Sequence, residues 1–356
     1  KASAIAAGTA FLIKNTKEAL NTMKDVDSEL ANIRKVTGES AESINRLGKE
    51  AYDTASKYGV SATEYLKGAA DFAKAGYSNY ANLAELAIKT QLVGDVSAET
   101  ASKFLLSADA AYKFGGNVDQ LSTVLDRANV IENNYATSID KLAEGFPIVA
   151  STASMANMSV DELMAALGTI TATTQEPGRK AATALRALIL NIEGEIGTVI
   201  DEDMTITQES VESMSDALKK YGNEAVKAAQ KTGKLIDPME AIKSLAEAYK
   251  NGDLDDQGLF NILSSLGGKL RTNQLTALIK NFDMYSDMLE KVKVSAGSAD
   301  AEIGIMQETW ERRTEKLKNS WTDLVSDIVD TDAVKGSLDV ITSAINGLDR
   351  AIEALT

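Results

Sequence analysis

The sequence predicts an all-α protein, a modular bundle of many short to medium amphipathic helices and helical hairpins. Only three prolines, Pro147, Pro177 and Pro238, interrupt the 356 residues. The stretches between them are rich in Ala, Leu, Lys and Glu, which form helices readily. Ser, Asn and Asp at cap positions, together with Gly, divide the chain into about fifteen helices. We also expect one tiny β-hairpin, near residues 203–207 and 234–236.

Four segments follow from this pattern: an N-terminal helix (1–37), an alanine-rich helical core (38–200), a second helical region after an acidic loop (201–295), and a long C-terminal helix plus a terminal helix (296–356). Lys1 is not an initiator Met, and Thr356 follows a helix in mid-pattern. We therefore expect a fragment of a longer chain.

The N-terminal helix begins with an apolar stretch, residues 2–13, that is similar to part of a signal peptide. No small-residue cleavage site follows, and the stretch is too short to span a bilayer. We therefore expect it to start a helix whose apolar face includes Val26 and Ile33. Any contact with a host membrane is expected from parts outside this fragment.

Residues 138–156 are expected to form a helix that Pro147 kinks or divides. The centre of the predicted fold is a helical hairpin that follows it, over residues 157–193. Ser159 and Glu162 have the spacing of a capping box. The first helix of the hairpin carries one apolar face, formed by Val160, Leu163, Met164, Leu167 and Ile170.

Thr173 and Thr174 should end this helix, and Pro177 suits the first turn of the next one. The second helix should bury Ala181, Leu185, Leu188, Ile189 and Ile192. Arg179 and Arg186 should lie on its outer side. The sequence thus predicts a compact hairpin with small residues inside.

The composition excludes several kinds of chemistry. There is no Cys and no His, which removes thiol chemistry, Ser/His/Asp triads and His-based zinc sites. Residues 201–212 have calcium-loop spacing, but Ile206 stands where the loop needs Gly. Residues 263–270 lack the first Gly and the Ser or Thr of a phosphate loop. We predict no enzyme activity, no cofactor and no metal, and the net charge of −15 argues against specific nucleic-acid binding.

Ala299–Val329 is predicted to be one uninterrupted helix, with Trp310, Leu317, Trp321, Leu324 and Ile328 on one face. This face either packs on the bundle or forms a coiled-coil or tube-facing interface. Another amphipathic helix is expected over Val334–Leu355. The interaction candidates in the whole chain are Ser159, Glu162, Pro177, Arg186, Trp310, Leu317, Trp321 and Leu324.

The strings SVDELMAAL (159–167) and GRKAATALRAL (178–188) resemble the core of tail tape-measure proteins of long-tailed bacteriophages. The pieces that resemble this family span roughly residues 40–330, in the family's order. The resemblance implies a structural protein that sets tail length, scaffolds tail-tube assembly and is released during DNA ejection.

The same resemblance implies where the protein acts and with what. The expected partners are the tail tube protein, distal tail or baseplate hub proteins, tail assembly chaperones and further copies of the chain. The expected location is the tail lumen or tip of the virion, and the host cytoplasm during assembly. Two alternatives stay open: a carrier segment of a tail-associated cell-wall hydrolase, and a helical bacterial surface or secreted interaction protein.

Overall fold

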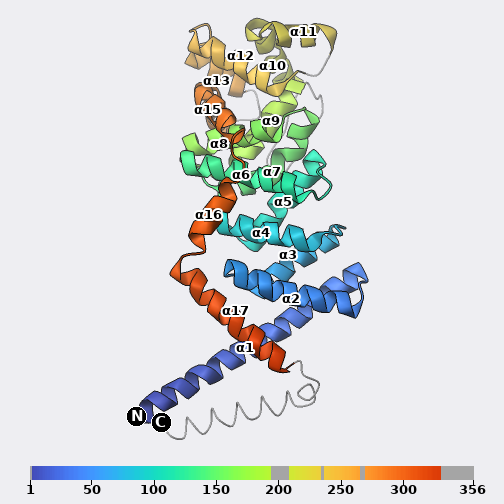
Figure 1. The fold of residues 1–356 in the computed structure, drawn as a ribbon. Helices are drawn as coiled ribbons and strands as arrows, with labels where there is room; N and C mark the ends of the chain where they lie inside the picture. Colours follow the sequence, from blue (N-terminus) through green and yellow to red (C-terminus); the bar gives the residue numbers. More distant parts are fainter. Residues whose placement is uncertain (1, 194–207, 234–235, 265–268, 330–356) are drawn as a thin grey trace. The chain divides into compact units, whose positions relative to one another are not determined.

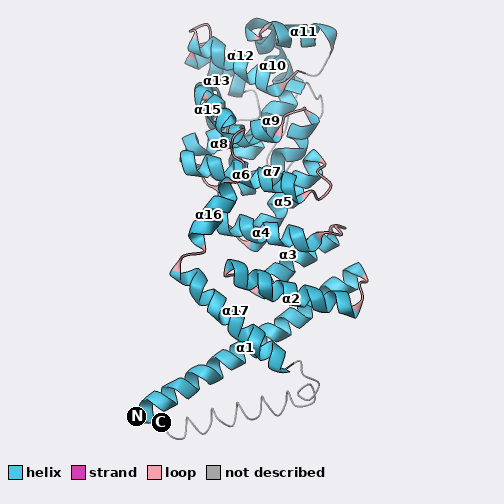
Figure 2. Ribbon diagram, in the orientation of Figure 1, coloured by secondary structure: helices cyan, strands magenta, loops and turns pink. Residues whose placement is uncertain are grey.

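Helices make up the regular structure of the protein. The computed structural model describes residues 2–193, 208–233, 236–264 and 269–329. Within them it contains seventeen helices and no strand (Figures 1 and 2). The predicted all-α class is therefore confirmed.

The chain forms two compact units, and the boundaries between them fall within helices α4 and α16. Unit 1 comprises residues 1–88 and 303–356, and unit 2 comprises residues 89–302. The helices of unit 1 are α1 (Ala2–Thr37), α2 (Ala41–Tyr58), α3 (Ala62–Lys74), α17 (Trp310–Val329), the first part of α4 (Tyr80–Gly94) and the end of α16 (Ser298–Met306).

Unit 2 holds the rest of α4 and α16 and the helices between them. These are α5 (Ala98–Tyr112), α6 (Val118–Asn134), α7 (Ile139–Met155), α8 (Val160–Thr174), α9 (Gly178–Glu193), α10 (Gln208–Tyr221), α11 (Glu224–Thr232), α12 (Pro238–Lys250), α13 (Asp256–Ser264), α14 (Lys269–Lys280) and α15 (Phe282–Val292). The four predicted sequence segments remain a prediction.

Side-chain caps explain where many of these helices begin. A side-chain oxygen accepts a hydrogen bond from a first-turn amide at Ser40, Ser61, Ser97, Asn117, Ser138, Ser159, Asn223 and Asp237. These bonds satisfy amides that have no partner within the helix. At the other end of α2, Gly59 adopts the left-handed conformation (φ 68°) and its amide bonds to the Ala55 carbonyl, which ends the helix.

The centre of unit 2 is α8, the first helix of the predicted hairpin. Every residue from 163 to 171 is buried, including Ala165, Ala166 and Thr169, which lie outside the predicted apolar face. Helices α6, α7, α9, α14 and α15 all contact α8. A helix enclosed on all sides needs small residues where neighbours approach closely, and Ala and Gly168 provide them.

The hairpin differs from the prediction at its turn. Thr173 and Thr174 belong to α8, because their hydroxyls donate to the carbonyls of Thr169 (2.7 Å) and Ile170 (2.8 Å), four residues back. The helix ends at Gln175, which adopts φ 59°. The predicted burial in the second helix is confirmed, since Ala181, Leu185, Leu188, Ile189 and Ile192 are at most 3% exposed.

Of the two outcomes predicted at Pro147, division is excluded, because α7 continues through Pro147 from Ile139 to Met155. A kink there stays a prediction. One further prediction needs correction. The single helix predicted over Ala299–Val329 is wrong, because α16 ends at Met306 and α17 starts at Trp310. In the turn between them, the Thr309 amide bonds to the Met306 carbonyl. The Thr309 hydroxyl then accepts a bond from the Arg312 amide at 3.5 Å, so it caps α17.

Some predictions fall on residues outside the described structure. They are the two strands of the β-hairpin at 203–207 and 234–235, most of the acidic loop 201–212, the two glycines at 267–268, and the terminal helix expected over 334–355. In the described part of α1, Val26 and Ile33 are buried as predicted.

Candidate functional site

The predicted capping box is present at the start of α8. The Glu162 amide donates to Ser159 Oγ at 3.2 Å, and the Ser159 amide donates to Glu162 Oε2 at 2.8 Å. The Ser159 hydroxyl also donates to Glu162 Oε2, at 2.7 Å. Each of the two side chains accepts the backbone amide of the other residue, and this reciprocal bonding fixes the first turn of the central helix.

Pro177 and Arg186 lie at the start and in the middle of α9. Pro177 precedes the helix, and its carbonyl accepts the Lys180 amide at 3.0 Å. Arg179 is exposed as predicted, whereas Arg186 is partly buried rather than on the outer side. The role of these residues in binding a partner stays a prediction.

Two glycines, Gly145 and Gly178, let α7 and α9 approach closely, and no motif in the sequence marks them. A Cβ atom on Gly178 would lie 1.6 Å from the Lys141 carbonyl oxygen, and one on Gly145 would lie 2.7 Å from the Gly178 carbonyl oxygen. Any larger residue would force the helices apart. Their spacing in the sequence gives no sign of this contact, because 33 residues separate them.

Aromatic side chains pack α5 against α7. The rings of Phe104 and Phe146 meet edge to face, with centroids 5.3 Å apart, and both residues are fully buried. Such a pair adds to the energy of burial itself. Helix α7 therefore contacts α5 through aromatic rings and α9 through glycines.

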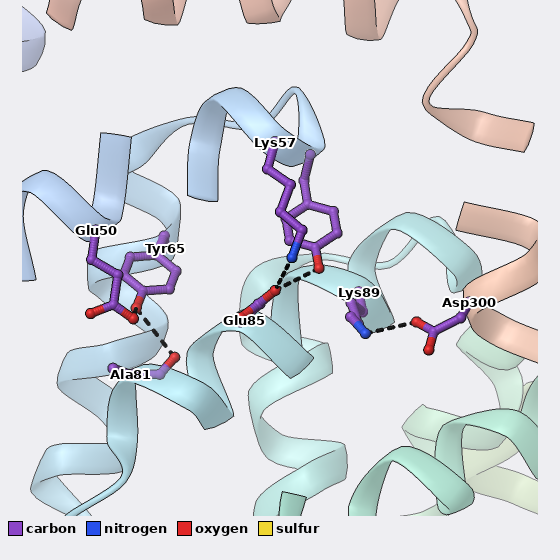
Figure 3. A network of polar contacts seen from close by, with 8 residues as sticks. Glu50, Lys57, Tyr65, Ala81, Glu85, Lys89 and Asp300 are labelled. Carbon is purple, nitrogen blue, oxygen red and sulfur yellow. Dashed lines mark hydrogen bonds and ion pairs between the residues drawn. The ribbon is translucent and has the colours of Figure 1, made fainter. Parts of the chain in front are cut away.

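In unit 1, carboxylates join neighbouring helices through tyrosine and lysine (Figure 3). Glu85 Oε1 accepts bonds from the Tyr58 hydroxyl (2.6 Å) and from Lys57 Nζ (2.7 Å). Burial, together with the bond to Glu85, raises the pKa of Tyr58 to about 12. Deeper in the same unit, the Tyr65 hydroxyl lies 3.1 Å from Glu50 Oε1, and burial raises its pKa.

A carboxylate, a tyrosine and a lysine also meet twice in unit 2, with Asp in place of Glu. Asp287 accepts bonds from Tyr135 and from Lys291, whose Nζ lies 4.7 Å from the Tyr135 ring centroid. Asp256 is bonded in the same way by Tyr249 and Lys280. These groups are largely exposed, so solvent screens the attraction and each contact adds little to stability. These contacts link neighbouring helices through side-chain hydrogen bonds.

Helix α16 is attached to unit 2 by a buried aspartate from α6. Asp126 is 7% exposed, and its carboxylate accepts the amides of Gly297 (2.9 Å) and Ala299 (3.0 Å). The positive end of the helix dipole stabilises a negatively charged carboxylate at this position. Within the same unit, Lys89 Nζ lies 2.7 Å from Asp300 Oδ1 (Figure 3).

Among the C-terminal interaction candidates, Leu317 is 71% exposed on α17. The side chains of Trp310, Trp321 and Leu324 lie outside the described part of the structure, although their backbone belongs to α17. The predicted apolar face is therefore described at one of its positions, and there it is open to solvent.

The described residues were compared with the requirements of a metal site and of a membrane span. They contain no group of three His, Cys, Asp or Glu side chains arranged to hold a metal ion. A pocket of about 340 Å³ lies between α12, α14 and α15, but its lysines already pair with carboxylates, as Lys250 does with Asp283 at 2.8 Å. Among the described helices, none is both long and apolar enough to cross a membrane.

One carboxyl group in unit 2 has a raised pKa. Glu132, near the end of α6, is partly buried, and desolvation raises its pKa above the usual value. The charges of Glu302, Asp95 and Asp140 act in the same direction, while a hydrogen bond from the Ile139 amide acts against them. Burial and the neighbouring carboxylates thus destabilise the charged form of Glu132. No basic residue is among the causes of the shift.

Comparison with known proteins gives one result that bears on function. The family described as phage-related minor tail protein matches residues 41–268 of the chain. The match runs from the first residue of α2 to just beyond α13 and includes the whole of the α8–α9 hairpin. No solved structure matches the chain.

Proposed function

Because the chain belongs to the family of phage-related minor tail proteins, a structural family of the phage tail, we propose that it is a tape-measure protein. In this role it sets the length of the tail, scaffolds assembly of the tail tube and is released during DNA ejection. The observation that carries the proposal is the position of the two tape-measure-like strings. Residues 159–167 form the cap and the first half of α8, and residues 178–188 form most of α9, inside the family match.

The proposal assigns different tasks to different parts of the protein. A helix advances about 1.5 Å per residue, so α1, with its 36 residues, spans only about 54 Å. Helices α2 to α16 have 18 residues or fewer and pack against one another. The described units therefore act as folded blocks that engage other tail components, and they are not a rod that measures length by themselves.

The partners we propose are the tail tube protein, the distal tail or baseplate hub proteins, the tail assembly chaperones and other copies of the chain. The proposed location is the lumen or tip of the tail. The acidic net charge of −15 suits a protein that leaves with DNA without binding it, because like charges repel.

The proposal is tested by removing the gene from the phage that carries it and restoring it on a plasmid. Tails should be absent or of uncontrolled length without the gene and uniform after complementation, as measured by electron microscopy. Tails of normal, uniform length in the absence of the protein would contradict the proposal.

Protease protection tests the proposed location. The protein should resist an added protease in intact particles and become sensitive once DNA ejection is triggered, while the tube protein serves as the loading control. Equal digestion before and after ejection would place the protein on the outside of the tail and would exclude the lumen.

A further inference from the structure

The pocket between α12, α14 and α15 in unit 2 differs in charge from the chain as a whole. Three lysines line it, Lys243, Lys250 and Lys280, against the two carboxylates of Glu247 and Asp283. The pocket is therefore net positive, on a chain whose net charge is −15. A local positive charge of this kind attracts an anionic group.

Apolar side chains form part of the pocket wall. Ala246 and Ile279 are 6% and 2% exposed and line the pocket together with Phe282. The Phe282 ring is partly buried and lies against the Tyr285 ring, with centroids 4.9 Å apart. Binding sites commonly combine apolar walls with a few charged groups that fix the orientation of the bound group. The volume of about 340 Å³ is enough for side chains of a partner.

Carboxylates of the chain itself show which anion these lysines accept. Lys250 Nζ lies 2.8 Å and 3.0 Å from the two carboxylate oxygens of Asp283. Lys280 donates to Asp256, which also accepts a bond from the Tyr249 hydroxyl at 2.8 Å. The bonds from Lys280 and Tyr249 lower the pKa of Asp256, so they stabilise its ionised form.

Two of the three lysines can exchange their present partner for another carboxylate. The side chains of Lys250 and Asp283 are 67% and 83% exposed, and ion pairs between exposed groups are weak. Lys243 Nζ lies 3.9 Å from Glu240 Oε1, which is beyond hydrogen-bonding distance. Lys243 and Lys250 can therefore bind carboxylates that come from outside the chain.

The spacing of these two lysines defines the group that fits them. They lie seven residues apart on α12, a separation of about 10.5 Å along the helix. An extended segment in the polyproline II conformation repeats every three residues, over about 9.3 Å, so residues three apart face the same way. Two carboxylates at this spacing can reach both lysines, and an apolar side chain between them can enter the pocket beside Ala246.

We propose that this pocket binds a short acidic segment of another protein, with two carboxylates three residues apart and an apolar residue between them. Lys243 and Lys250 bind the carboxylates, and Asp283 is the competitor within the chain that one of them displaces. A protein segment fits better than DNA, because the net charge of −15 repels a long polyanion, whereas salt limits a short segment to the local charge. The inference does not depend on the tape-measure role.

Nuclear magnetic resonance of the protein with labelled Ala and Ile methyl groups tests the pocket directly. The probe is the peptide Gly-Ser-Asp-Ala-Leu-Asp-Gly-Ser with both termini blocked. It should shift the methyl signals of Ala246 and Ile279 until they saturate, and its affinity should fall as salt is added. The same peptide with Asn in place of both Asp residues is the control and should not shift them. No shift with the Asp peptide, or equal shifts with both, would overturn the proposal.

Variants at exposed positions separate the lysines from their competitor. Lys243→Gln and Lys250→Gln should each weaken binding of the Asp peptide about fivefold, and Asp283→Asn should strengthen it by a similar factor. Lys219→Gln is the matched control, because this exposed lysine lies on α10, outside the pocket. Unchanged affinity in both pocket-lysine variants, or no gain in Asp283→Asn, would contradict the proposed contacts.

A short single-stranded DNA of thymidines distinguishes phosphate from carboxylate as the bound anion. It should leave the signals of Ala246 and Ile279 unchanged at concentrations at which the Asp peptide saturates them. Shifts at the same or a lower concentration would show that the pocket binds nucleic acid, and the proposal would then be wrong.

Discussion

Gly178 fixes the distance between α7 and α9, because its missing side chain lets the Lys141 carbonyl come close. We predict that Gly178→Ala destabilises unit 2 by about 1–3 kcal/mol or more, since the added methyl group cannot fit without moving backbone. The free energy of unfolding in urea measures the effect. Gly304→Ala is the matched control, because nothing lies within 4 Å of the new Cβ in helix α16. It should be neutral or slightly stabilising.

The raised pKa of Glu132 predicts how the stability of unit 2 depends on pH. Its pKa is raised in the folded protein by burial and by neighbouring carboxylates, so the folded state holds this proton more tightly than the unfolded state. The favourable contribution is fully present below the unfolded pKa and is lost as pH rises through the folded pKa. Glu132→Gln should therefore be more stable than the parent at pH 7, and this difference should disappear in acid. Urea unfolding at several pH values measures it, and a difference that does not change with pH would contradict the assignment.

At the residue scale, the sequence predicts local contacts well and distant ones poorly. The Ser159–Glu162 capping box depends on residues three apart, and the structure contains it. The exposed position of Arg179 was also predicted from the helical period alone. The Gly178–Lys141 contact joins residues whose separation carries no signal, because it depends on how two helices cross.

At the scale of single elements, α16 depends on Asp126. We predict that Asp126→Ala destabilises unit 2 by about 1–2 kcal/mol, because two amides at the start of α16 lose their acceptor. Hydrogen exchange of the Gly297 and Ala299 amides should become faster, while amides in the centre of α8 should respond less. Asp253→Ala, at an exposed position, is the control and should leave both measurements unchanged.

Two predicted helix ends differ from the structure, and both differences have identifiable causes. Thr173 and Thr174 extend α8, because their hydroxyls bond back to its carbonyls and so compensate for poor helix propensity. The apolar pattern does not show the break before Trp310, because the pattern continues across it, although Thr309 caps the next helix. An apolar period indicates which face is buried, but it does not show where the backbone turns.

At the scale of the whole molecule, the hairpin over residues 157–193 distinguishes a folded block from a ruler. A pure ruler would tolerate deletion of these residues and give tails shorter by about 55 Å. We predict instead that the deletion prevents assembly or infection, because α8 is the buried centre of unit 2. Electron microscopy of particles from the deletion phage measures the outcome. Infectious particles with proportionally shorter tails would contradict it.

The short helices also determine how the protein responds to force. Helices α2 to α16 have between 9 and 18 residues, a length at which an isolated helix is only marginally stable in water. A helix that is pulled away from its neighbours therefore loses its structure. Because the sequence has no Cys, no disulfide interrupts this process. The folded units can thus be drawn out as a continuous thread through an opening much narrower than themselves.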